Sequence, residues 1–349
     1  MKSQDDIFDL LHSKHSEAAH ALRRSLILQP GAIGDCILTL PLAQFMKNML
    51  TLGGIDIVGH TDYTSVLPDR TCIDGIRSID SLDLHRLFMK ADSFDLPDGD
   101  LLIYAFEGYS WVVTFLGEEG SDFEQNLIYT ANCSQGAEIV TMQFSPPKKQ
   151  DLHLTEFYIR QFIAQIGLPT KHKDYRRDQI LIKTLESDRE QGRRLLKRVG
   201  VDFSKKVVVI HPGSGSLKKC WHLDNFLSIG RQASSKNMEV VFLLGPAETE
   251  RLEPRMSQIC EIGSCLSNLS LNEVIGILSC ADYYIGNDSG ITHLAGGLGV
   301  NTIAVFGPTN PKIYSPVGPS VKVLIDKSKR FSKKGVSSLQ KNVIDILTA

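Results

Sequence analysis

The sequence lacks three features that would place it in a special class of protein. Its seven cysteines are scattered along the chain, and none forms a Cys-x-x-Cys pair or a zinc-type spacing with histidine. This excludes a disulfide-stabilised scaffold and favours a reducing cytoplasm. No run of about 18 apolar residues occurs, which excludes a transmembrane helix. Charged residues also interrupt positions 1–24, so no signal-peptide core is predicted.

The chain also has no large excess of either charge. It contains 38 lysines and arginines against 40 aspartates and glutamates, a formal net charge of −2. This balance provides no general attraction to nucleic acid, which is therefore not an expected partner. An apolar fraction of 42% and a charged fraction of 22% are ordinary for a globular protein and argue against disorder. A length of 349 residues predicts two domains.

The first half is predicted to be an α/β domain, residues 1–175. Residues 25–29 form a short apolar strand pattern, followed by a glycine-rich turn and an apolar helix over 36–50. Two further strands are expected at 55–58 and 101–106. Between 107 and 145 the pattern is weak. The charged stretch 171–177 resembles a solvated linker, and this sets the domain boundary near 175.

The second half, residues 176–325, alternates strands and helices regularly. Because the strands are apolar and rich in β-branched residues, they predict a parallel sheet covered by helices on both faces. The expected strands are 207–210, 239–244, 282–285 and 302–306; the expected helices are 184–199, one from about 223, one through Leu252, Met256 and Ile259, one capped by Ser270 with Glu273, and one with Ile291 and Leu294. A last helix, about 336–348 within segment 326–349, is expected to pack back on the domains.

Three turns are unusually rich in glycine and polar residues. They are 31–35, 211–219 and 286–293, and each follows a predicted strand. Ligands of doubly wound sheets bind at such turns, because helix N-termini offer unpaired N–H groups. The first turn has the spacing Gly-x-x-Gly-Asp rather than Gly-x-Gly-x-x-Gly, which disfavours an NAD site. In the third, the amides at Ser289 and Gly290 are suited to holding a phosphate.

Taken together, these turns resemble glycosyltransferase family 9, the lipopolysaccharide heptosyltransferase family. The motifs that carry the resemblance are Gly-Ala-Ile-Gly-Asp (31–35), His-Pro-Gly-Ser-Gly with Lys-Cys-Trp (211–221), Gly-Pro-Ala-Glu-Thr-Glu (245–250), Gly-Asn-Asp-Ser-Gly-Ile-Thr-His-Leu-Ala (286–295) and Phe-Gly-Pro-Thr-Asn-Pro (306–311). The resemblance is dense over 205–317 and 25–45. Over 60–145, where the family binds its acceptor, almost nothing is recognisable. His222 stands where the family usually has proline, and Gly296-Gly297 replaces alanines.

The resemblance implies a GT-B fold, in which two Rossmann-like domains face each other across a cleft. It implies an inverting transfer of heptose from an ADP-sugar to a lipopolysaccharide inner-core or similar glycan acceptor. The N-terminal domain would bind the acceptor and the C-terminal domain the donor. The implied catalytic residues are Asp35, as base, and Lys219, on the diphosphate. The donor-binding residues are expected to be Gly34, Ser214, Glu248, Asp288, Ser289, Gly290 and His293.

No cofactor is expected to be required. Lys219 and a helix N-terminus are able to stabilise the leaving diphosphate, so Mg²⁺ is compatible with the chemistry but not demanded. Asp98-Gly-Asp100 has the Asp-x-Asp form of a metal motif, but it precedes the apolar segment 101–106 and is interpreted as a turn. The pair His12 and His15 is interpreted as part of a solvated helix.

Structural roles remain open for several of these residues. Asp35 could act only as a helix cap, and Lys219 could be a solvated lysine. Trp221 is typical of a core residue, and His211 could satisfy a backbone group. Either Glu248 or Glu250 could be the ribose ligand.

Two other classes of function fit the same motifs. One is a GT-B epimerase or hydrolase of nucleotide sugars, and the other is a nucleotide-sugar-binding protein without catalysis. The expected location is the cytoplasm. Peripheral contact with the inner membrane is expected through Lys171–Lys173 and Lys327–Lys334, because the acceptor would be a glycolipid.

Overall fold

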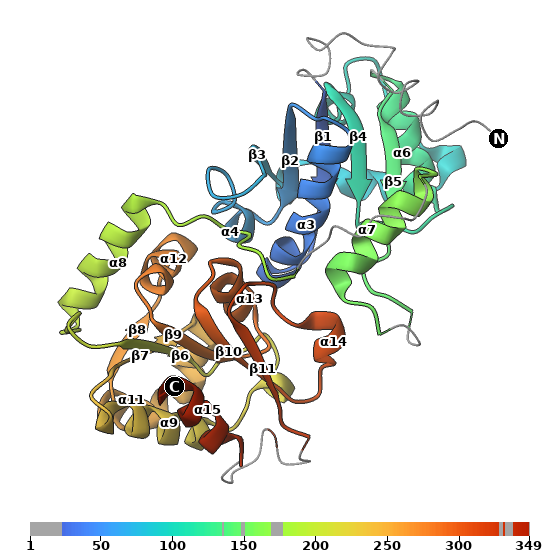
Figure 1. The fold of residues 1–349 in the computed structure, drawn as a ribbon. Helices are drawn as coiled ribbons and strands as arrows, with labels where there is room; N and C mark the ends of the chain where they lie inside the picture. The colour runs from blue at the N-terminus through green and yellow to red at the C-terminus, as the bar shows by residue number, and fades with distance from the viewer. Residues whose placement is uncertain are drawn as a thin grey trace. The chain divides into compact units, whose positions relative to one another are not determined.

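A computed structural model describes residues 23–134, 136–147, 151–168, 177–327, 331 and 338–348. The chain forms two compact units, each with its own parallel sheet (Figure 1). Unit 1 takes the chain up to residue 31 together with 39–145 and 157–172, and unit 2 takes 32–38, 146–156 and the chain from 173 onward. The α/β fold class is confirmed. The expected boundary at 175 lies outside the described residues.

Unit 1 contains a five-stranded parallel sheet in the order β3-β2-β1-β4-β5. Four of the five residues of the central strand β1 are buried, as its apolar sequence predicts. The elements that begin in this part of the chain are β1 (Arg24–Leu28), α3 (Ile33–Met49), β2 (Gly54–Gly59), α4 (Thr61–Thr64), β3 (Gly75–Ser78), η1 (Ile79–Ser81), η2 (Leu84–Phe88), η3 (Ala91–Ser93), α5 (Leu101–Ala105), β4 (Tyr109–Thr114), α6 (Asp122–Asn132), β5 (Glu138–Thr141) and α7 (Leu154–Gln165).

The strand expected at 101–106 is wrong, because this segment is the short helix α5. The Asp100 carboxylate caps the helix by accepting a hydrogen bond from the backbone N–H of Leu102 at 2.9 Å. Leu102 and Ala105 are buried, three residues apart, which is a helical spacing that the six-residue apolar run 101–106 does not distinguish from a strand. The strand is instead β4, in the segment where the sequence pattern is weak.

Unit 2 contains a six-stranded parallel sheet in the order β11-β10-β9-β6-β7-β8. The chain order reverses between β6 and β9, which lie side by side in the middle of the sheet. The elements are α8 (Glu186–Arg198), β6 (Val207–His211), η4 (Leu217–Lys219), α9 (Leu223–Ser235), β7 (Glu239–Leu244), α10 (Pro246–Leu252), η5 (Glu253–Arg255), α11 (Met256–Cys260), β8 (Ser264–Ser267), α12 (Leu271–Ser279), β9 (Tyr283–Asn287), α13 (Gly290–Gly297), β10 (Asn301–Phe306), α14 (Pro311–Tyr314), β11 (Val321–Ile325) and α15 (Leu339–Thr348).

The helix expected through Leu252, Met256 and Ile259 is interrupted in the structure. Helix α10 ends at Leu252, the 3-10 turn η5 follows, and α11 begins at Met256. Pro254 explains the interruption, because proline has no backbone N–H to donate to an α-helical bond. The capping box of Ser270 and Glu273 is confirmed at the start of α12.

The C-terminal helix α15 belongs to the core of unit 2. It begins at Leu339, and the expected Val336 lies outside the described residues. Val343, Ile344 and Leu347 are buried in the same hydrophobic cluster as α9 residues such as Phe226. Their spacing of one, three and four residues places one face of α15 on the domain.

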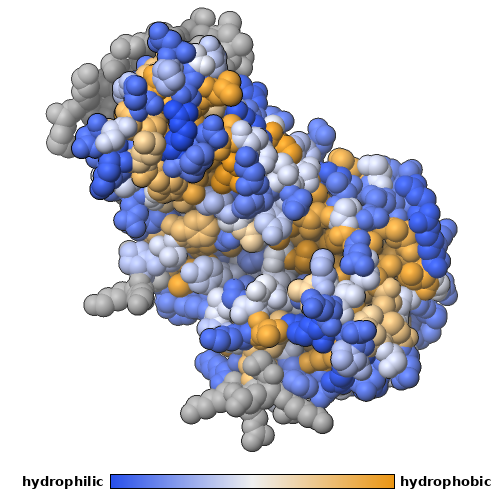
Figure 2. Space-filling model, turned by 180° about the vertical axis from the view of Figure 1, so that it is seen from behind, coloured by the Kyte–Doolittle hydropathy of each residue, from blue (hydrophilic) through white to orange (hydrophobic). Residues whose placement is uncertain are grey.

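The surface mixes hydrophilic and hydrophobic residues. Figure 2 shows blue hydrophilic residues interspersed with orange hydrophobic areas on one face of the molecule. Among the described residues, no helix has the length and apolar character that a membrane crossing requires.

The close packing of α8 on α12 yields a stability prediction. A Cβ atom added at Gly192 would lie 1.9 Å from the backbone oxygen of Gly276. We therefore expect Gly192→Ala to destabilise unit 2 by about 1–3 kcal/mol, although alanine favours helix formation by about 1 kcal/mol. Thermal unfolding measures the effect, and the exposed Ser187→Ala on the same helix is the control. Unchanged stability of Gly192→Ala would contradict this helix packing.

Candidate functional site

The candidate site lies where the strand order of unit 2 reverses. Strands β6 and β9 pair in parallel, with His211 opposite Gly286, so the turns that follow them leave the sheet side by side. Such a reversal opens a crevice at the carboxyl ends of the strands, which is where doubly wound sheets bind ligands. The turn after β6 leads to Lys219, and the turn after β9 carries Asp288 and Ser289.

The Asn287 side chain joins these two turns. Its Oδ1 accepts a hydrogen bond from the backbone N–H of Trp221 at 2.8 Å, and its Nδ2 donates to the backbone oxygens of Pro212 and Gly213 at 3.0 and 3.2 Å. Ser214 adds a further link, because its hydroxyl donates to the backbone oxygen of Asp288 at 2.6 Å. Asn287 was not among the expected site residues, although it stands inside the quoted motif. It positions both turns.

Lys219 and Asp288 form an ion pair at this position. The Lys219 Nζ lies 2.9 Å from the Asp288 Oδ2, and the side chains are 39% and 7% exposed. The two atoms are at ion-pair distance but not in hydrogen-bonding geometry, and Asp288 Oδ2 has no hydrogen-bond partner among the residues that the structure describes. Lys219 is therefore more than a solvated lysine. Its ammonium is held at the turn and still reaches solvent.

Of the three ionisable side chains Lys219, Asp288 and His293, the His293 side chain is the most deeply buried. It stands in the first turn of α13, and its Nε2 lies 3.9 Å from the Asp288 Oδ1. Its Nδ1 has no hydrogen-bond partner within the described part of the chain. Burial lowers the pKa of His293 to about 4, although the Asp288 charge acts in the opposite direction. The imidazole is therefore neutral at pH 7.

Ser289 and Gly290 begin helix α13. The Ser289 hydroxyl caps the helix by accepting from the backbone N–H of Thr292 at 3.4 Å. A Cβ atom added at Gly290 would lie 2.0 Å from the Ile33 Cγ2, so only glycine allows this close approach. Gly34 lies beside His293, because a Cβ atom added there would be 3.2 Å from the His293 Cδ2. These contacts belong to unit 2, which includes 32–38.

Glu248 and Glu250 have different environments. The Glu248 side chain is buried, and its Oε2 accepts from the backbone N–H of Gly245 at 3.1 Å, from the third position of α10. Its carboxyl group packs so closely on Gly213 that a Cβ atom there would lie 2.3 Å from the Glu248 Cδ. Glu250 is exposed. Of the two glutamates, Glu248 is the one that contacts the turn after β6.

Asp35 is the third residue of α3 and does act as a cap. Its Oδ2 accepts a hydrogen bond from the backbone N–H of Ala32 at 3.0 Å. Burial is the largest influence on this carboxyl group and raises its pKa, the Ala32 hydrogen bond and Lys219 lower it, and Asp288 raises it. The helix N-terminus alone would favour ionisation. The Asp35 carboxyl group thus has the raised affinity for a proton that suits a general base.

Two departures from the family pattern have local structural reasons. His222 donates its backbone N–H to the Phe331 oxygen at 3.1 Å, and its Nδ1 accepts from the Asp224 N–H at 3.3 Å to cap α9. Proline could make neither contact. A Cβ atom at Gly296 would lie 3.0 Å from the Val317 oxygen, so glycine allows α13 to approach that loop.

Trp221, His211 and Asp100 have the structural roles considered for them. Trp221 is 2% exposed, and its Nε1 donates to Asp326 at 3.1 Å within the core. The His211 Nδ1 lies 2.9 Å from the Leu243 backbone oxygen. Asp100 pairs with Arg86 at 2.8 Å, which fits the interpretation of Asp98-Gly-Asp100 as a turn. Within the part of the chain that the structure describes, no group of three His, Cys, Asp or Glu side chains is placed to hold a metal ion. His12 and His15 lie outside that part.

Comparisons with known proteins agree with this architecture. The family model described as glycosyltransferase family 9 (heptosyltransferase) matches residues 147–343, more than half of the chain. The sequence is 27% identical over 188 residues to lipopolysaccharide heptosyltransferase 1 of Campylobacter coli, covering 52% of each protein. Matches with the first curated relatives span about a third to a half of those relatives' length.

Solved structures match over a larger part of the chain. The ADP-heptose heptosyltransferase II of E. coli is similar with a TM-score of 0.67 and 14% identity, covering 93% of this chain and 97% of that one. The E. coli heptosyltransferase WaaC with ADP is similar with a TM-score of 0.62 and 16% identity, covering 93% and 99%. These likenesses concern the fold, and the expected GT-B architecture is confirmed.

The buried histidines predict an acid-sensitive stability. Burial lowers the pKa of His153 to about 4, as it does for His293, whereas an unfolded histidine has a pKa of about 6.5. Between these values the unfolded chain binds more protons, so the free energy of unfolding should fall as the pH decreases from about 6.5 to about 4. His153→Gln should reduce this slope by up to about 1.4 kcal/mol per pH unit. Urea unfolding at several pH values measures it, with the exposed His85→Gln as the control. An identical slope in His153→Gln would contradict a neutral buried His153.

Proposed function

Because the chain belongs to glycosyltransferase family 9, the heptosyltransferase family, we propose that it transfers heptose from an ADP-sugar to a lipopolysaccharide inner-core or similar glycan, with inversion at the anomeric carbon. The observation that carries the proposal is the Lys219–Asp288 pair, at 2.9 Å, in the turns between which the strand order reverses. This pair presents a cation at the position where doubly wound sheets bind nucleotides.

The donor diphosphate would take the place of Asp288 as the partner of Lys219. Exchange is favoured because the Lys219 side chain is 39% exposed and does not form a hydrogen bond of good geometry with Asp288. Ser214, Ser289 and Gly290 would contribute a hydroxyl group and the amides at the start of α13. The charge on the diphosphate grows as the sugar leaves, so the Lys219 ammonium stabilises the transition state more than the bound substrate. Glu248 would bind the ribose hydroxyl groups.

Asp35 would be the base that removes the proton from the acceptor hydroxyl. Lys219 and Asp288 both influence the pKa of its carboxyl group, which supports a place for Asp35 beside the diphosphate position. The neutral His293 would orient the sugar or phosphate without adding a charge. We propose that Lys219 and the α13 N-terminus neutralise the diphosphate without a cofactor, although Mg²⁺ is compatible with this chemistry.

The acceptor is proposed to be a glycolipid or oligosaccharide, and the location the cytoplasm with peripheral contact at the inner membrane. The clusters expected to contact the membrane, Lys171–Lys173 and Lys327–Lys334, lie outside the described residues except for Lys327 and Phe331. Epimerisation or hydrolysis of a nucleotide sugar would consume the donor without any acceptor, and a binding protein would consume none. Donor turnover with and without acceptor therefore distinguishes the three functions.

The donor assignment predicts a nucleotide preference. Wild-type protein should bind ADP and ADP-heptose more tightly than UDP and a UDP-sugar in calorimetry. Lys219→Ala should weaken ADP binding and lower kcat, by roughly 2–4 kcal/mol in kcat/KM, because the ammonium meets the developing charge. The adjacent exposed Lys218→Ala is the matched control. Preference for a uridine nucleotide would contradict the heptosyltransferase proposal and leave the fold unaffected.

The variant Asp35→Asn distinguishes a catalytic base at this position from a residue that only caps helix α3. Asparagine keeps an oxygen that accepts from the Ala32 N–H, so the variant should fold normally and bind donor within a few fold of wild type. Loss of the proton acceptor should reduce transfer by roughly 10²–10⁴. Transfer rate and melting temperature are measured together, with Asp35→Ala reporting the cost of losing the cap. Near-normal transfer by Asp35→Asn would eliminate the catalytic role.

A further inference from the structure

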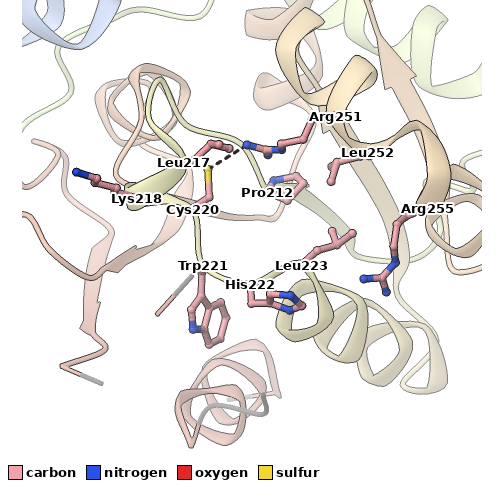
Figure 3. Close-up of a pocket in the computed structure, with 10 residues that line it drawn as sticks. All are labelled: Pro212, Leu217, Lys218, Cys220, Trp221, His222, Leu223, Arg251, Leu252 and Arg255. Atoms are coloured by element: carbon pink, nitrogen blue, oxygen red, sulfur yellow. Dashed lines mark hydrogen bonds between the residues drawn. The ribbon is translucent and has the colours of Figure 1, made fainter. Parts of the chain in front are cut away.

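A cavity of about 420 Å³ lies in unit 2 beside the proposed donor site. It is formed by the segment that leads from η4 into α9 and by α10 with η5 (Figure 3). Figure 3 shows Arg251, Leu252 and Arg255 along one side, with His222 and Leu223 on the opposite side. Its ten lining residues are Pro212, Leu217, Lys218, Cys220, Trp221, His222, Leu223, Arg251, Leu252 and Arg255.

The wall of this cavity is cationic and apolar. It contains two arginines and one lysine, and none of the ten lining residues is an aspartate or glutamate. Pro212 and the leucines add apolar surface. A volume of several hundred cubic ångströms is in the range of sites for small molecules. The wall therefore suits a ligand that combines an anionic group with an uncharged body.

The two arginines differ in how far their charge is compensated. Arg255 is paired, because its Nη2 lies 2.7 Å from the Asp224 Oδ1 and its Nε donates to Gln258 at 2.8 Å. Among the described residues, the hydrogen-bond partner of the Arg251 Nη1 is the Cys220 Sγ, at 3.6 Å, and sulfur is a weak acceptor. Among the described residues, no carboxylate forms an ion pair with Arg251. A guanidinium with five donors is thus left without an anionic partner in the cavity wall.

We propose that this cavity is a second anion site, which binds a phosphate-bearing small molecule through Arg251. The planar guanidinium suits phosphate oxygens because it donates two parallel hydrogen bonds. Arg255 extends the positive wall from the next turn of the chain, and the leucines contact the uncharged part of the ligand. The Lys218 side chain extends away from both arginines in Figure 3 and is not needed for binding.

This site is separate from the proposed donor residues but shares elements with them. Cys220 follows Lys219 directly, and Arg251 stands one turn after Glu248 on α10. Glu248 packs on Gly213, whereas Arg251 contacts Cys220, so the two side chains contact different parts of the segment that joins β6 to α9. The inference does not depend on the proposed transfer reaction.

Calorimetry on four proteins tests the proposal, with phenyl phosphate, inorganic phosphate and ADP as the probes. Wild type should bind phenyl phosphate more tightly than inorganic phosphate, because only the former contacts the leucines. Arg251→Gln should weaken phenyl phosphate binding about tenfold or more, as expected for loss of a charged hydrogen bond, and change ADP binding less than threefold. Lys219→Ala should do the reverse. Arg231→Gln, an exposed arginine of α9, is the matched control and should change neither.

Several results would overturn the second site. One is that wild type does not bind phenyl phosphate, and another is that Arg251→Gln binds phenyl phosphate as tightly as wild type does. A third is that Arg251→Gln and Lys219→Ala each lose the binding of both ADP and phenyl phosphate, which would make the cavity part of the donor site. Equal affinity for inorganic phosphate and phenyl phosphate would overturn the role of the leucines. If Arg251→Gln does not fold, Arg251→Lys replaces it, because lysine keeps the charge but loses the paired hydrogen bonds. Absence of ADP binding to wild type would contradict the donor proposal alone.

Discussion

The candidate site depends on the carboxamide of Asn287. Two strands that are neighbours in the sheet but distant in sequence end beside each other. The buried Asn287 amide supplies three hydrogen bonds between these turns, each worth about 1 kcal/mol. Its hydrogen bond to Trp221 fixes the start of the segment that leads into α9. Because Lys219 stands two residues before Trp221, the same bond also helps to place Lys219 beside Asp288. Charge placement at the site is therefore a consequence of one buried polar side chain.

Burial then shifts the pKa values of two groups of the site. It lowers the pKa of His293 and raises that of Asp35, in each case favouring the neutral form. The ion pair of Lys219 with Asp288 places one exposed cation beside a buried carboxylate. In the proposed reaction, the diphosphate leaving group, whose negative charge grows as the sugar departs, would meet the ammonium and the amides at the start of α13, with a neutral imidazole beside them. The ammonium and the backbone amides of such an arrangement stabilise negative charge.

Local sequence patterns predicted the wrong secondary structure in two segments, because the same pattern of apolar residues fits more than one secondary structure. The apolar run at 101–106 is too short to separate strand from helix, and the Asp100 cap decided the outcome. The periodicity through Leu252, Met256 and Ile259 is helical, but Pro254 divides it between two helices. The division matters for the cavity, because the 3-10 turn η5 carries Arg255 along its wall.

The sequence by itself determined the alternation of strands and helices in unit 2 and the parallel sheet of that unit. These follow from periodicity and from the backbone geometry that glycine and capping residues permit within a few residues of the chain. Only the tertiary structure decided that Asn287 joins the turns, that Glu248 rather than Glu250 faces Gly213, and that Arg251 has no carboxylate partner within the described residues. The physical reason is that hydrogen bonds, burial and charge compensation depend on side chains brought together from distant positions, such as Trp221 and Asn287, which local sequence patterns do not encode.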